Sequence, residues 1–205
     1  AVIVKDDWVV AQGWHQAAGG PHAEINALDD AGENARGATL YVTLEPCSHH
    51  GRTPPCAQAL VDAGIARAVI ATPDPNPAVS GQGLALLRAA GVETVSDVLA
   101  EPARQLNEGF LRRMAGGMPW VRLKVAASLD GRTAMASGES QWITGAAGRS
   151  DVQRLRARSG AIITGAGTVS ADDPSLTVRP SEMGETGDKT LPPEQPLRAV
   201  TDPRL

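Results

Sequence analysis

The sequence predicts an α/β protein built from two domains, and two observations support this prediction. Short runs rich in β-branched residues alternate with stretches of helical periodicity, a pattern typical of a mixed or parallel sheet covered by helices on its faces. A Gly116-Gly117 pair then ends a long helical stretch, and a new apolar run begins after Pro119. We therefore expect one domain at residues 1–117 and a second at residues 118–205.

The first domain is expected to open with two strands, at residues 2–4 and 8–10, joined in a hairpin by residues 5–7. A glycine-rich loop then leads to a helix over residues 22–35, in which apolar residues recur at spacings of three. Pro55 suits the first position of a later helix. The other elements expected in order are a strand at 39–44, a helix at 55–64, a strand at 66–72, a rigid proline-rich loop at 73–77, a helix at 84–90, a strand at 92–95 and a helix at 99–114.

The second domain is expected to begin with a strand at residues 120–127, followed by a turn at Asp130-Gly131. Residues 146–158 have the character of a helix that carries several arginines. Strands at 161–164 and 197–201 follow, and the polar, proline-rich segment 180–196 between them predicts a mobile surface loop.

Composition narrows the class of partner. The formal net charge is −4 and aromatic residues make up 3% of the chain, which disfavours a nucleic-acid substrate because a polyanion needs cations and unpaired bases need stacking platforms. An apolar run of about 18 residues, long enough to cross a membrane, is not found in the sequence. The chain also opens without the features of a signal peptide. We expect a cytoplasmic protein whose two cysteines serve a metal or catalysis.

Four residues form the strongest functional signal. His22, Cys47 and Cys56 offer the nitrogen and sulfur ligands that zinc prefers, and Glu24 follows the histidine by two positions. Taken alone, the histidine could be a helix cap and each cysteine a small buried apolar residue. Their combination near two expected helix starts, however, matches the zinc deaminase signature. A structural zinc would need a fourth protein ligand, which His49 or His50 could supply.

This residue set suits hydrolytic deamination of a nitrogen heterocycle. A bound zinc ion makes water nucleophilic near neutral pH. Glu24 is then the predicted proton shuttle, which accepts a proton from the water and passes it to the ring nitrogen and to the departing amine.

The spacing of the cysteines narrows the class further. Eight residues separate Cys47 from Cys56, whereas cytidine and tRNA deaminases typically have two. The stretch 43–56 (TLEPCSHHGRTPPC), preceded by Pro21-His22-Ala23-Glu24, closely resembles the bifunctional riboflavin-biosynthesis deaminase/reductase family. The resemblance implies a cytidine-deaminase-like three-layer α/β/α domain that acts on 2,5-diamino-6-ribosylamino-4(3H)-pyrimidinone 5′-phosphate. It also implies a substrate-binding role for His49 in the loop between the cysteines.

The resemblance continues beyond residue 117. The segments 122–132 (RLKVAASLDGR), 137–144 (SGESQWIT), 165–169 (GAGTV) and 171–174 (ADDP) are similar to the family's reductase domain. That domain has a fold like dihydrofolate reductase and uses NADPH to reduce the ribosyl group to ribityl. The roles that the resemblance implies are NADPH binding by Ala126, Trp142, Thr168 and Asp172, substrate binding by Ser140, Arg156, Leu176 and Arg179, and polarisation or protonation of the ribosyl group by Lys124. A solvated helix face is an equal alternative for Arg156, given the arginines around it.

Compared with the family pattern, the sequence starts after the family's first helix and ends within the reductase domain, so we expect an incomplete reductase fold. The expected partner is a small phosphorylated pyrimidine, with zinc and NADPH as cofactors and neither nucleic acid nor membrane as a partner. The family is often oligomeric, which leaves a homo-oligomer open. Two other classes remain as alternatives: a zinc-dependent nucleoside or tRNA deaminase, and a non-catalytic scaffold stabilised by zinc.

Overall fold

The computed structural model describes residues 1–49, 54–77, 79–184 and 195–204. The chain divides into two compact units, Ala1–Val121 (unit 1) and Arg122–Leu205 (unit 2). This division and the boundary predicted after Gly117 both fall in the irregular segment that follows the last helix of unit 1. Among the described residues, no helix combines the length and the apolar character needed to cross a bilayer.

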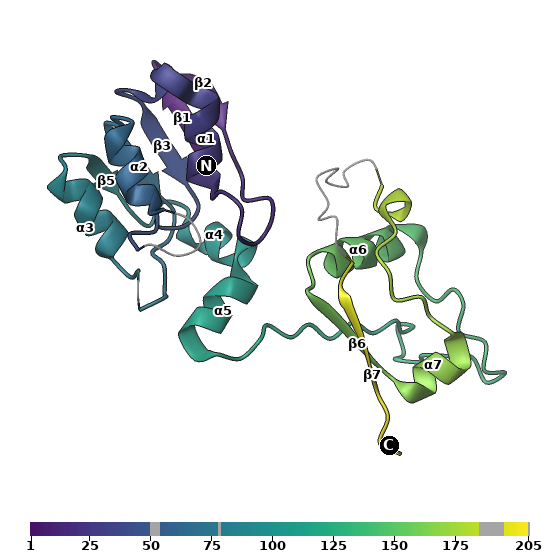
Figure 1. Ribbon diagram of the computed structural model, residues 1–205. Helices are drawn as coiled ribbons and strands as arrows, with labels where there is room; N and C mark the ends of the chain where they lie inside the picture. The colour runs from purple at the N-terminus through teal and green to yellow at the C-terminus, as the bar shows by residue number, and fades with distance from the viewer. Residues whose placement is uncertain (50–53, 78, 185–194, 205) are drawn as a thin grey trace. The chain divides into compact units, whose positions relative to one another are not determined.

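Unit 1 is built on a five-stranded mixed sheet (Figure 1). The strand order is β2-β1-β3-β4-β5, in which β1 runs antiparallel to both of its neighbours and β3, β4 and β5 run parallel to one another. The mixed sheet predicted from the alternation of strands and helices is therefore confirmed. The strands are β1 (Val2–Lys5), β2 (Trp8–Gln12), β3 (Thr39–Val42), β4 (Arg67–Ile70) and β5 (Glu93–Val95).

The hairpin between β1 and β2 turns on two residues with left-handed backbone. Asp6 has φ 50° and Asp7 has φ 63°. Positive φ at both central positions is the requirement of a type I′ turn, whose twist matches that of the two flanking strands. Aspartate tolerates this region better than most residues, so the predicted hairpin forms without glycine.

Helices cover both faces of this sheet, as expected for a three-layer fold. α1 (Ala23–Ala31), α2 (Cys56–Asp62) and α3 (Gln82–Ala89) lie over one face (Figure 1), and a 3₁₀ turn, η1 (Gly32–Ala35), continues α1. On β3, Leu40 and Val42 enter the core under these helices, while Tyr41 points to the opposite face. There Tyr41 lines an apolar cavity with residues of α4 (Ala100–Leu106).

A close approach of the backbone positions the start of α1. A Cβ placed on Gly13, just after β2, would lie 2.4 Å from both the Ala23 oxygen and the Ala27 nitrogen. Only glycine allows this contact, because a side chain there would overlap the helix backbone. The first turn of α1, which follows His22, is therefore held against the end of β2.

Two helical expectations for unit 1 are corrected by the structure. The single helix expected at 99–114 is two helices, α4 and α5 (Glu108–Gly116), because Asn107 leaves helical geometry at φ −109° and ψ 19°. The Asn107 side-chain amide donates to the Ala103 carbonyl at 3.3 Å, which competes with continuation of the helix. Pro55 is the N-cap of α2 rather than its first residue, so Cys56 begins the helix.

Unit 2 contains a two-stranded parallel sheet of β6 (Ala161–Gly165) and β7 (Leu197–Thr201). The predicted strands at 161–164 and 197–201 and the helix at 146–158 are confirmed, the helix as α6 (Ala146–Ala157). The structure adds α7 (Ala166–Asp172), which the sequence did not predict, and a 3₁₀ turn, η2 (Pro180–Glu182). Most of the loop predicted at 180–196 lies outside the described residues.

The predicted strand at residues 120–127 is wrong for this structure, where the segment is irregular. A strand is stabilised by hydrogen bonds to a neighbouring strand. Within the described residues, β6 and β7 pair with each other, and segment 120–127 has no place in either sheet. Its apolar side chains are exposed as a result, with Leu123 at 89% and Val121 at 78% relative accessibility.

Candidate functional site

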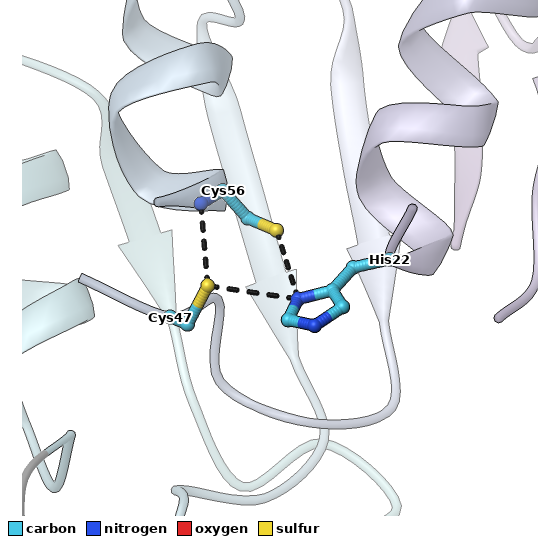
Figure 2. A group of neighbouring side chains, drawn as sticks. All are labelled: His22, Cys47 and Cys56. Carbon is cyan, nitrogen blue, oxygen red and sulfur yellow. Dashed lines mark hydrogen bonds between the residues drawn. The ribbon is translucent and has the colours of Figure 1, made fainter. Parts of the chain in front are cut away.

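Three side chains with metal-binding atoms meet in unit 1, although they come from separate segments of the chain. His22 is the N-cap of α1, Cys47 lies in the loop that follows β3, and Cys56 is the first residue of α2. Their ligand atoms all lie within 4.8 Å of one another. Figure 2 shows the His22 ring pointing its Nδ1 atom towards the two sulfur atoms.

The distances within this group fit a tetrahedral zinc ion. Nδ1 of His22 lies 3.6 Å from Sγ of Cys47 and 3.3 Å from Sγ of Cys56. Zinc holds nitrogen at about 2.0 Å and sulfur at about 2.3 Å, so tetrahedral nitrogen and sulfur ligands stand about 3.6 Å apart. The three residues therefore fit a zinc ion bound by one nitrogen and two sulfur atoms.

The protein backbone prepares one of the sulfur atoms to be negatively charged. The Cys56 amide donates a hydrogen bond to Sγ of Cys47 at 3.3 Å, at the N-terminus of α2. Hydrogen bonds from the Cys56 thiol and backbone lower the pKa of Cys47 to about 5. The same thiol pair, together with burial, raises the pKa of Cys56, because the two sulfur atoms share one proton. A cation between them would replace that proton, since zinc binds thiolates.

Glu24 lies in the first turn of α1 and is 7% exposed. Burial raises the pKa of its carboxyl group, which favours the protonated form, and His22 opposes this shift. A buried carboxyl next to a metal-binding group can both accept and donate a proton near neutral pH. The geometry therefore agrees with the proton-transfer role expected for Glu24.

The fourth ligand of the structural-zinc alternative is not found in the part of the chain that the structure describes. The metal-binding group there contains His22, Cys47 and Cys56, and His49 is exposed outside it. His50 lies outside the described residues. Three protein ligands leave a fourth position for water, which is the arrangement of a catalytic zinc.

Three polar residues beside this centre were not predicted from the sequence. Glu45 is 3% exposed and Asp74 is 6% exposed, and the buried Ser48 hydroxyl has no hydrogen-bond partner among the described residues. Glu45 and Ser48 follow β3, and Asp74 follows β4. Because β3 and β4 are parallel, their carboxyl ends meet at one edge of the sheet, where ligands bind in open α/β sheets. The position of these residues just after two parallel strands could have indicated them from the sequence.

In unit 2, most of the predicted reductase residues line a single cavity. The cavity has a volume of about 460 Å³. The predicted residues that line it are Lys124, Ala126, Ser140, Arg156, Thr168, Asp172, Leu176 and Arg179. Trp142 is not among the lining residues; its ring is 69% exposed and lies 4.6 Å from the Arg149 guanidinium carbon. What these residues bind stays a prediction.

Two arginines give this cavity a local positive charge. Arg156 donates to the Thr177 carbonyl at 2.9 Å, and Arg179 forms a 2.6 Å ion pair with Glu182. Burial and the neighbouring Arg179 lower the pKa of Arg156, while Glu182 opposes this shift. Arg156 lines the cavity and is half-buried, which distinguishes it from the solvated helix face that was its alternative.

Comparisons with known proteins match both parts of the chain. Residues 1–72 match the family described as the cytidine and deoxycytidylate deaminase zinc-binding region, and residues 119–205 match the RibD C-terminal domain. The chain is 58% identical over 204 residues to the riboflavin biosynthesis protein RibD of Escherichia coli, covering 98% of this chain and 56% of that protein. It is 48% identical to the RibD protein of Bacillus amyloliquefaciens, covering 100% of this chain and 53% of that protein.

Solved structures give the same result. RibD of Acinetobacter baumannii matches with a TM-score of 0.87 and 56% identity, covering 100% of this chain and 57% of that one. A Thermotoga maritima structure is described as a diaminohydroxyphosphoribosylaminopyrimidine deaminase/5-amino-6-(5-phosphoribosylamino)uracil reductase. It matches with a TM-score of 0.86 and 42% identity, covering 98% of this chain and 55% of that one. The chain spans just over half the length of these relatives.

Fold and site together define a two-domain protein in which a cytidine-deaminase-like zinc-binding domain precedes a domain of the dihydrofolate reductase type. Proteins of riboflavin biosynthesis have the same two domains in the same order and are similar to this chain along nearly its whole length. Over nearly its whole length the chain is similar to RibD proteins.

Proposed function

We propose that unit 1 is the zinc-dependent deaminase of riboflavin biosynthesis and that unit 2 belongs to its NADPH-dependent reductase. One observation carries the first part of the proposal. The donor atoms of His22, Cys47 and Cys56 stand at zinc-ligand spacing, and the buried Glu24 follows His22 by two residues. A structural zinc has no need of a buried, protonatable carboxyl group beside it, whereas hydrolytic deamination does.

The proposed chemistry assigns each residue one task. His22, Cys47 and Cys56 hold the metal, which when bound supplies an activated water nucleophile. A carboxyl oxygen of Glu24 accepts one proton of that water and donates it to the ring nitrogen next to the attacked carbon. Glu24 then takes the second proton, from the hydroxyl group that has added to this carbon, and passes it to the amine, which leaves as ammonia while the carbonyl forms. Burial of Glu24 keeps bulk water from competing for this proton.

The proposed substrate is 2,5-diamino-6-ribosylamino-4(3H)-pyrimidinone 5′-phosphate. The similar structure from Thermotoga maritima is that of a diaminohydroxyphosphoribosylaminopyrimidine deaminase, which acts on this kind of compound. His49 lies in the loop after Cys47, at the edge of the sheet where the metal-binding group is found, and we assign it to substrate binding. The proposal makes this protein a cytoplasmic enzyme, in agreement with its two free cysteines.

For unit 2 we propose reduction of the ribosyl group of the deaminated product to ribityl. Ala126, Thr168 and Asp172 would lie along NADPH, together with Trp142, while Ser140 and Leu176 would contact the substrate. Arg156 and Arg179 would pair with its phosphate, because guanidinium groups bind phosphate through charge-assisted hydrogen bonds. Lys124 would polarise the ribosyl group as hydride arrives. The shared cavity, whose lining includes both arginines and Lys124, supports this assignment.

Zinc content and ammonia release test the deaminase proposal together. We expect one zinc ion per chain by mass spectrometry and release of ammonia from the diaminopyrimidine phosphate. Cytidine and deoxycytidylate serve as matched controls, since a nucleoside deaminase would prefer them. Preference for cytidine would replace the proposed substrate, and zinc binding without deamination of any of the three would support the scaffold alternative. For unit 2, NADPH is titrated into the chain and followed by its fluorescence; an unchanged signal would contradict the assignment.

A further inference from the structure

Glu45 is a buried carboxylate that the proposed chemistry does not use. It follows β3 and stands directly before Pro46 and the metal-binding Cys47. Its side chain is 3% exposed, and its backbone N–H donates to the Thr72 carbonyl at 3.0 Å. Burying a carboxylate is costly unless hydrogen bonds replace its water, so its partners reveal its role.

The partners of Glu45 are three backbone N–H groups from one distant segment. Oε2 accepts from the amides of Asp74 at 3.2 Å and Gly81 at 3.0 Å, and Oε1 accepts from the amide of Leu84 at 3.2 Å. These donors span the connection between β4 and α3 and the first turn of α3. A single side chain therefore ties the loop of Cys47 to the described chain after β4 at three points, Asp74, Gly81 and Leu84.

The local sequence explains why this segment needs an external acceptor. The first N–H groups of a helix have no partner inside the helix, and a negative charge near them is stabilising. The N-cap of α3 is Gly81, which makes no side-chain cap. Glu45 supplies, from the loop after β3, the capping that the segment lacks.

A second contact brings α3 and the ligand loop together. A Cβ placed on Gly83 would lie 2.0 Å from the Pro46 carbonyl oxygen and 3.2 Å from Oε1 of Glu45. The start of α3 is therefore packed directly on the peptide that precedes Cys47. Only glycine allows the two backbones to approach this closely. The hydrogen bonds of Glu45 and the packing of Gly83 act at the same place.

One of the residues that Glu45 holds, Asp74, lies near the metal-binding group. Asp74 is 6% exposed, and its carboxyl group interacts electrostatically with Glu45, His49 and Cys47. Its own Oδ1 accepts from the Asn76 amide at 2.8 Å, which fixes the turn after it. A shift of this segment would therefore move polar groups that stand beside the zinc ligands.

We propose that Glu45 is a positioning residue that holds Asp74, Gly81 and Leu84 against the peptide before Cys47 and so sets the substrate-facing wall of the deaminase site. The proposal rests on the proposed function, since it takes the metal centre to be the place where the pyrimidine binds. Glu45 is neither ligand nor proton shuttle: both of its oxygen atoms already accept from backbone donors, and it is outside the metal-binding group of the described residues.

Glu45→Gln tests this role with little change of shape. The amide of glutamine donates, so in either orientation it places an N–H group against a backbone N–H of Asp74, Gly81 or Leu84. We expect hydrogen exchange at these three amides to be at least about tenfold faster, because they lose charge-assisted hydrogen bonds. We also expect the KM for the diaminopyrimidine phosphate to rise about tenfold or more while kcat changes less than KM, with zinc still bound at one ion per chain.

Glu33→Gln is the matched control, because Glu33 is an exposed glutamate of the same unit and should leave every readout unchanged. Unchanged exchange at the three amides of Glu45→Gln, or a fall in kcat with KM unchanged, would overturn the proposal. If Glu45→Gln does not fold, Glu45→Asp carries the same measurements, since it keeps the charge but withdraws it by one methylene group. The exchange experiment needs no substrate, so it stands even if the wild-type chain releases no ammonia and the proposed function fails.

Discussion

The two units place their candidate sites on very different supports. In unit 1 the core contains fully buried side chains from the sheet and from α1, α2 and α3, among them Ile3, Leu40, Leu60, Ile70 and Leu87. Among the described residues of unit 2, the buried residues are Gln153, Val178, Met183 and Pro196. Large apolar side chains there are instead exposed, such as Leu123, Val125 and Leu129.

This difference shows what holds a site at fixed distances. Two of the three zinc ligands of unit 1, His22 and Cys56, lie at the starts of helices that pack on a continuous core, so small displacements would cost packing energy. The cavity of unit 2 is lined largely by side chains from irregular segments, and Lys124, Thr168 and Asp172 are exposed there. We therefore expect changes in unit 1 to act strongly at single positions and changes in unit 2 to act weakly.

The largest effect is expected at Glu24. Glu24→Gln removes the proton shuttle but keeps the shape of the side chain, so ammonia release should fall by about 10² to 10⁴-fold. Zinc content should stay at one ion per chain, because Glu24 is not in the metal-binding group. Steady-state kinetics and mass spectrometry measure the two quantities. Retention of more than a tenth of the activity would show that another group transfers the proton.

A matched pair of leucines tests the difference in packing directly. Leu60, on α2, is 0% exposed, whereas Leu123 is 89% exposed. In the chain of residues 1–205, Leu60→Ala should lower the free energy of unfolding by about 2–5 kcal/mol, because it leaves a cavity in the core. Leu123→Ala should change it by less than about 0.5 kcal/mol. Urea unfolding followed by circular dichroism measures both, and equal effects would break the comparison.

A smaller effect is expected in the cavity of unit 2. Arg156→Ala should weaken binding of ribose 5-phosphate about tenfold, since one charge-assisted partner of the phosphate is lost. Arg204→Ala is the control, because Arg204 pairs with Asp202 and does not line the cavity. Isothermal titration calorimetry gives the dissociation constants. Equal weakening by the two variants would point to general charge rather than to a phosphate site.

The smallest effect is expected in the β1–β2 hairpin. Asp7→Gly should raise the free energy of unfolding of unit 1 by about 0.5 kcal/mol, because glycine adopts a positive φ without steric cost and Asp-Gly is favoured in type I′ turns. Lys5→Gly, in the adjoining strand, should instead lower it. Thermal unfolding measures the shifts, and destabilisation by Asp7→Gly would show that its carboxylate contributes more than its backbone strain costs.

Prediction from sequence succeeded where a short pattern determines the structure. His22 and Cys56 were correctly placed at helix starts, and α6, β6 and β7 formed as expected. It failed for residues 120–127 because the strand needs a partner, and no local pattern shows whether one is present. The break at Asn107 was missed because one side-chain hydrogen bond overrode helical periodicity.

The sequence by itself determined the chemistry available to this protein: the residue types of a zinc centre, their spacing, and the order of the two domains. Only the tertiary structure decided how that centre is supported. Glu45 reaches donors 29 to 39 positions away, at Asp74, Gly81 and Leu84. Such contacts depend on β3 and β4 lying side by side, so they become visible only once the parallel strands have brought their ends to the same edge of the sheet.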